Sequence, residues 1–86
     1  MEKIVDIKIG DMISFQNMKL GLRYVKFEYD MYFINLSIKI GERFYAVEVN
    51  PEVCLLIEGY SIEVLESKKE NCKIKLEKNT KELFQV

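Results

Sequence analysis

Apolar and polar residues alternate along residues 31–50, and this pattern predicts two paired β-strands. In residues 31–40 every second position is apolar or aromatic, namely Tyr32, Ile34, Leu36, Ile38 and Ile40. A period of two is typical of a strand with one buried face. Gly41 and Glu42 follow, and a glycine at the first central position suits a type II′ turn, which needs a positive φ there. The sequence therefore predicts a β-hairpin with Gly41-Glu42 as its turn.

The position of this turn determines which residues of the hairpin face each other. On the core face the predicted pairs are Ile40–Arg43, Ile38–Tyr45, Leu36–Val47 and Ile34–Val49. On the opposite face they are Lys39–Phe44, Ser37–Ala46 and Asn35–Glu48. A slip of one residue would move every apolar side chain to the other face, so the pattern specifies the register. The residues expected in the core include Leu36, Ile38, Tyr45 and Val47.

The residues before this hairpin predict further strands. Alternation in residues 1–9 predicts the first one, and a loop at residues 10–12 would fold it back on the next, with Ile9 opposite Ile13 and Ile7 opposite Phe15. Residues 16–21 are interpreted as a connector. Residues 22–29 predict a strand that extends the hairpin into an antiparallel meander of three strands.

The residues after Pro51 predict a second hairpin. Residues 53–57 fit a buried strand or a helical face, and a strand or a single turn is favoured. Residues 60–66 and 72–78 predict two strands joined by a loop at 67–71, with the pairs Val64–Ile74, Ile62–Leu76 and Glu63–Lys75. Residues 79–82 resemble a helix capping box, and residues 83–86 fit a last helical turn or an edge strand.

These elements predict one all-β, mainly antiparallel domain over residues 1–86. Six or seven short strands at hairpin spacing are expected to form a small curled barrel or a two-layer sandwich, with at most one short helix. A length of 86 residues is typical of a single domain.

Composition limits the cellular location and the binding partners that can be expected for this chain. Thirteen basic and fourteen acidic residues give a net charge of −1, so nothing draws the whole chain to nucleic acid or to an anionic membrane. Neither an apolar run long enough to span a bilayer nor a signal-peptide pattern is found, and a cytoplasmic location is expected. Cys54 and Cys72 lack metal-site spacing and are interpreted as buried free thiols, although the sequence leaves a disulfide open.

The chain lacks most of the groups that carry catalysis. It contains no histidine, which removes the commonest general base and the commonest zinc ligand. Its four glycines are isolated, so no glycine-rich phosphate loop is present. We therefore expect a protein that is not an enzyme and that has no cofactor and no metal site.

Three aromatic residues fall on the polar face of the predicted meander: Tyr24, Phe33 and Phe44. Together with Lys39 and Glu48 they predict a protein-binding patch, because aromatic side chains concentrate binding energy at interfaces. A second layer covering these rings is the structural alternative. This hypothesis describes a small protein-binding module: a stoichiometric inhibitor or adaptor of a larger protein, or a self-assembling subunit.

Uneven charge supports an alternative function. Basic residues with interleaved aromatics are typical of small barrels that bind single-stranded nucleic acid. The candidate residues are Lys19, Arg23 and Lys26 together with Lys73 and Lys75 of the last predicted strand. Residues 42–66 weigh against this function, since they contain six glutamates and a single basic residue, Arg43.

Overall fold

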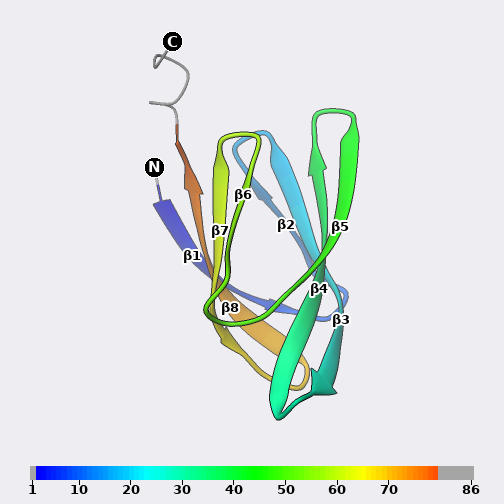
Figure 1. Cartoon of the computed structure of the whole chain (residues 1–86). Coiled ribbons are helices and arrows are strands. Elements are labelled where there is room, and N and C mark those ends of the chain that lie inside the picture. Colours follow the sequence, from blue (N-terminus) through cyan, green and yellow to red (C-terminus); the bar gives the residue numbers. More distant parts are fainter. Residues whose placement is uncertain (1, 80–86) are drawn as a thin grey trace.

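The computed structural model describes residues 2–79, which form eight β-strands in two antiparallel sheets of four (Figure 1). The strands are β1 (Glu2–Lys8), β2 (Met12–Phe15), β3 (Met18–Glu28), β4 (Met31–Ile40), β5 (Arg43–Val49), β6 (Cys54–Ile57), β7 (Tyr60–Ser67) and β8 (Asn71–Lys78). One sheet has the order β1-β8-β7-β6. The other has the order β2-β3-β4-β5 and is called the meander sheet below. The all-β prediction is confirmed in its sandwich form rather than as a barrel, with eight strands and no helix among the described residues.

Both predicted hairpins have the predicted registers. In β4 and β5 every predicted pair is present, from Ile40–Arg43 at the turn to Ile34–Val49. Gly41 has a φ of 63°, as its place in the turn requires. In β7 and β8 the three predicted pairs are also present, although the strands extend further into the loop than expected. The favoured strand interpretation of residues 53–57 is confirmed by β6.

The predicted pairing of the first two strands is wrong. Instead of folding back on β2, β1 pairs with β8, with Val5 opposite Ile74 and Ile7 opposite Cys72. Gly10, at a φ of 95°, lies where the chain passes from one sheet to the other. A glycine there permits a change of direction that is not a hairpin.

The predicted connector at residues 16–21 is also wrong. β2 pairs with β3 through a tight turn, with Phe15 opposite Met18. Most of the expected connector therefore belongs to β3. The physical reason is that Met18, Leu20 and Leu22 alternate and are all buried, so a strand in this place removes three large apolar side chains from water.

The core lies between the two sheets and contains side chains from seven of the eight strands. Leu36 and Ile38 are buried, as predicted, whereas Tyr45 and Val47 pack against the core and stay partly exposed. These two residues lie on β5, an edge strand of the meander sheet. The inward-facing residues of β6, Leu55 and Ile57, are likewise only partly buried.

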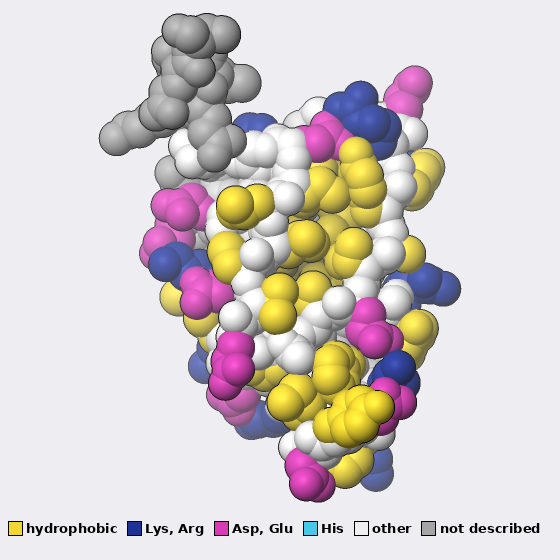
Figure 2. Space-filling view, viewed as in Figure 1, with side chains coloured by type: hydrophobic (Ala, Val, Ile, Leu, Met, Phe, Trp, Pro, Cys, Tyr) yellow, Lys and Arg dark blue, Asp and Glu magenta, His cyan; other side chains and the backbone are white. Residues whose placement is uncertain are grey.

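This partial exposure occurs on one side of the sandwich, where β5 and β6 are edge strands of different sheets and do not pair. Hydrophobic side chains are visible in the interval between them in Figure 2. On the other side, the backbone of Ile9 bridges to Leu22, and Gly10 N donates a hydrogen bond to Leu22 O at 2.9 Å. Within residues 2–79, backbone-to-backbone hydrogen bonds between the two sheets therefore lie on this side only.

The two cysteines differ in exposure. Both are free thiols, but only Cys72 is buried, so the expectation of two buried thiols is wrong for Cys54. Cys54 begins the edge strand β6 and lies 3.2 Å from the hydroxyl of Ser61. The capping box and final turn predicted for residues 79–86 lie, beyond Asn79, outside the described residues. Residues 2–79 include no helix that could cross a membrane.

Candidate functional site on the outer face of the meander sheet

The outer face of the meander sheet, called the meander face below, carries most of the residues that the sequence marked as candidates. Leu20 and Ile38 point into the core, so their neighbours Lys19 and Lys39 point outward. Strand pairing places the outward residues in rows across the sheet. One row is Ser14, Lys19, Lys39 and Phe44, the next is Met12, Gly21, Ser37 and Ala46, and a third is Tyr24, Asn35 and Glu48.

Phe44 is the most prominent apolar residue on this face. It lies on the edge strand β5, and its side chain is 73% exposed. The ammonium of Lys39 lies 5.2 Å from the centre of the Phe44 ring, within the range of a cation–π interaction. This contact favours a position in which the ring stays against the sheet with much of its surface available.

Lys19 and Lys39 face each other directly across β3 and β4. None of the ion pairs found in residues 2–79 includes either of them. Like charges directly opposite each other in a sheet are destabilising. The two lysines therefore occupy directly opposed positions on the meander face, and neither forms an ion pair within residues 2–79.

A small cavity adjoins these two lysines. It has a volume of about 100 Å³ and is lined by Met12, Lys19, Ser37, Ile38, Lys39 and Phe44. Gly21 contributes to the hollow, because a Cβ atom at this position would lie 2.9 Å from the hydroxyl oxygen of Ser37. Met12 is 62% exposed. It begins β2, whereas the sequence predicted that it lies in the loop at residues 10–12.

A second group of residues surrounds Tyr24 on the same face. A β-bulge between Leu22 and Tyr24 adds Arg23 to the strand, and the Arg23 guanidinium donates a hydrogen bond to Asn35 Oδ1 at 3.2 Å. The same guanidinium lies 5.9 Å from the centre of the Tyr24 ring. Tyr24 is 44% exposed, and Arg23 satisfies the side-chain oxygen of the buried Asn35.

Lys26 and Glu48 neutralise each other beside this group. The Lys26 ammonium lies 3.4 Å from Glu48 and 3.7 Å from Glu28. Its pKa is raised, chiefly by the hydrogen bond with Glu48 and further by the charge of Glu28. Phe33, opposite Lys26 in the register, is partly buried. The five residues of the predicted patch thus share one face, with Tyr24 and Phe44 as its exposed rings.

The candidate nucleic-acid residues are divided between the two sheets. Lys19, Arg23 and Lys26 lie on β3, whereas Lys73 and Lys75 lie on β8 of the other sheet. Lys75 is paired with Glu2 at 3.2 Å, and the hydrogen bond with Glu2 raises its pKa. With Lys26 and Lys75 both occupied by carboxylates, the five residues do not form one basic track.

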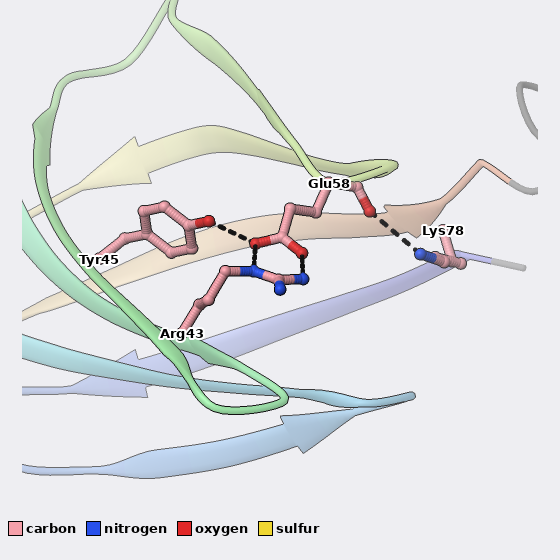
Figure 3. Close-up of polar contacts among 4 residues, drawn as sticks. All are labelled: Arg43, Tyr45, Glu58 and Lys78. Carbon is pink, nitrogen blue, oxygen red and sulfur yellow. Dashed lines mark hydrogen bonds and ion pairs between the residues drawn. The ribbon is translucent and has the colours of Figure 1, made fainter.

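A separate polar group joins the sheets where β5 and β6 do not pair. Here it is called the Glu58 cluster and consists of Arg43, Tyr45 and Glu58 (Figure 3). Arg43 Nε donates to Glu58 Oε2 at 2.8 Å, and Arg43 Nη2 and the Tyr45 hydroxyl also donate to this carboxylate. The ammonium of Lys78 donates to the backbone oxygen of Glu58 at 3.1 Å.

These contacts shift the pKa values of Glu58 and Tyr45 in opposite directions. The hydrogen bonds from Arg43 and Tyr45 lower the pKa of Glu58 to about 2, whereas the carboxylate raises the pKa of Tyr45. Nothing local in the sequence predicted this cluster, because Arg43 begins β5 and Glu58 lies fifteen positions later, in the turn between β6 and β7 of the other sheet. Its carboxylate is bound from several sides by this chain's own donors, which is typical of a structural contact. Among the described residues no group of three or more cysteine or acidic side chains could hold a metal ion.

Comparison of the chain with protein-family models, with curated proteins and with solved structures finds no significant match. The meander face is therefore interpreted from its own chemistry.

Proposed function

We propose that this protein is a non-catalytic protein-binding module that binds its partner with the meander face. The observation that carries this proposal is the exposure of Phe44 and Met12 on either side of a small cavity. Exposed apolar residues gathered on one sheet face are typical of interaction sites, and buried aromatic anchors dominate their binding energy.

The fold itself does not require these side chains. Phe44 and Met12 point away from the core, and neither belongs to the buried cluster between the sheets. Their burial by a partner would remove apolar surface from water, at about 25 cal/mol for each Å². Phe44 and Met12 thus offer a partner apolar surface that the fold itself does not use.

The charges on this face favour a different protein over a second copy of the chain. A symmetric dimer brings the same patch of each copy together. A two-fold axis through the cavity would place Lys19 and Lys39 beside the same two lysines of the second copy. A larger protein that this module inhibits or links to another fits the charge distribution better.

A non-catalytic role is supported by the chemical inventory. The chain contains no histidine, and the carboxylate with the strongly lowered pKa, Glu58, is bound by Arg43 and Tyr45. Lowered acidity of this kind suits an ion pair and does not suit a general base near neutral pH.

The test compares two substitutions of equally exposed residues. Phe44 on the meander sheet and Leu56 on β6 are both 73% exposed, so Phe44→Ser and Leu56→Ser remove apolar surface at matched sites. Each purified variant is immobilised and exposed to an extract of the source cells. We expect a stoichiometric partner to be retained by the unsubstituted protein and by Leu56→Ser, and to be lost from Phe44→Ser.

The expected loss for Phe44→Ser is about 2 kcal/mol or more of binding free energy, which is roughly thirtyfold in Kd. Equal retention by Phe44→Ser, with loss from Leu56→Ser, would place the interface on the other sheet. Circular dichroism and cooperative melting of each variant verify that both remain folded.

A further inference from the structure

We infer that the segment recognised by this protein carries an acidic residue next to an aliphatic one. The pair Lys19 and Lys39 binds the carboxylate, and the cavity beside Met12 receives the aliphatic side chain. This inference rests on the proposed function, because it specifies the partner of the same face.

The lysine pair suits a bound carboxylate. Lys19 and Lys39 are directly opposite on neighbouring strands, and Ser14 and Phe44 complete their row without a negative charge. Like charges at directly opposed positions of neighbouring strands are unfavourable. A carboxylate between the ammonium groups would remove the repulsion and form two charge-assisted hydrogen bonds, which are among the strongest that proteins make.

The neighbouring cavity suits an aliphatic side chain. Its volume of about 100 Å³ is comparable with one aliphatic side chain. Its apolar side chains are those of Met12 and Phe44, since Ile38 points into the core, and its polar lining includes the two lysines. A flexible methionine can adjust its shape to different apolar side chains. Small apolar sites with a few polar groups at their margin are typical of recognition sites.

The closeness of these two features defines the spacing in the partner. Lys19 and Lys39 both line the cavity, so the carboxylate and the aliphatic group must reach adjoining positions. In an extended segment this places the acidic and the aliphatic residue one or two positions apart.

A protein segment fits this face better than a nucleic acid does. A phosphate would also bind the lysines, but Lys26 on the same face is already paired with Glu28 and Glu48, so a line of free positive charges does not continue along the sheet. An apolar cavity also offers little to the polar edges of a base. Nucleic-acid binding is therefore an outcome that the experiment must distinguish.

The experiment selects displayed random peptides on the immobilised full chain. The enriched peptides are expected to share Asp or Glu within two positions of Leu, Ile, Val or Met. A synthetic peptide of the enriched sequence should bind Lys19→Glu at least about tenfold more weakly than the unsubstituted chain. Lys69→Glu is the matched control, because Lys69 is exposed in the β7–β8 turn and its reversal changes the net charge equally. This control should bind the peptide unchanged.

Lys19→Glu is expected to remain folded. Lys19→Glu places a carboxylate opposite Lys39, so repulsion becomes attraction and the thermal midpoint should rise. Weaker binding by a more stable protein cannot be attributed to unfolding.

The remaining outcomes separate a failure of this inference from a failure of the proposed function. Enriched peptides without an acidic residue, lost with Phe44→Ser and retained with Lys19→Glu, would overturn this inference and leave the proposed function intact. Peptides that bind Phe44→Ser and Lys19→Glu as well as they bind the unsubstituted chain would overturn both. Tighter binding of a labelled oligothymidylate than of any enriched peptide, sensitive to Lys19→Glu, would assign the lysine pair to phosphate and overturn the inference.

Discussion

Arg43 and Glu58 form an ion pair that joins the two sheets on the side where β5 and β6 do not pair. The Tyr45 hydroxyl donates a hydrogen bond to the same carboxylate (Figure 3). Side chains therefore provide on this side the connection that the backbone of Ile9, Gly10 and Leu22 provides on the other. The Glu58 cluster fixes the position of β5, and Phe44 lies on this strand between Arg43 and Tyr45.

The Glu58 cluster predicts a specific loss of stability in acid. Folding lowers the pKa of Glu58 from 4.5 to about 2, so the folded state binds this proton less readily than the unfolded chain does. The resulting stabilisation is complete above pH 4.5 and is lost as the pH falls through about 2. Urea unfolding between pH 5 and pH 2 should therefore show a steeper decline for the unsubstituted protein than for Glu58→Gln. Parallel declines would show that the carboxylate does not contribute through this pair.

Leu36→Ala should be strongly destabilising. Leu36 is buried between the sheets on β4, and its truncation leaves a cavity in the core. The expected loss of unfolding free energy is about 2–5 kcal/mol, measured by chemical denaturation. Leu56→Ala is the control, because this leucine is exposed and should change stability by less than about 0.5 kcal/mol. Similar small effects at both positions would contradict the assignment of the β4 core face.

Lys19→Glu should stabilise the protein. The substitution turns a cross-strand pair of like charges into a pair of opposite charges with Lys39, which is worth about 0.2–1 kcal/mol in a sheet. The gain should shrink in roughly 1 M salt, because surface charges are then screened. Unfolding free energies measured at low and high salt test this prediction. A loss of stability at low salt would show that the two ammonium groups do not oppose each other.

The two thiols should react at different rates in the native protein. Cys54 is exposed on an edge strand, whereas Cys72 is buried and its burial raises its pKa to about 11. Because the thiolate is the reactive form, iodoacetamide should label Cys54 alone until denaturant is added. Mass spectrometry of the labelled chain counts the modified sites. Native labelling of a Cys54→Ser variant would indicate that the core around Cys72 opens readily.

The parts of the fold that could be predicted are those in which local signals agree. In β4 and β5 the alternation of apolar residues and the turn at Gly41 specify the same register. In contrast, β1 pairs with β8 near the other end of the chain, and no local pattern distinguishes this partner from β2. Alternation indicates that a strand exists and which face is apolar, but it does not name a distant neighbour.

The candidate site was predictable to a similar extent. The register of the hairpin placed Lys39, Phe44 and Glu48 on the outer face, because only the alternation of side chains is needed for this. The separation of Lys73 from Lys19 depends on the packing of strands distant in the sequence. Met12 was missed because its strand has only four residues.

The most direct test of the proposed interface uses the methyl groups of the methionines. Met12 lies at the cavity of the meander face, whereas Met31 is partly exposed at the β3–β4 turn and Met18 is buried. The chain is labelled with ¹³C at its methionine methyl groups and titrated with the partner that it retains. The Met12 signal should shift or broaden with increasing partner, while the Met31 signal stays in place. A Met12 signal that stays unchanged at saturating partner, whether or not Met31 shifts, would contradict binding at the cavity of the meander face.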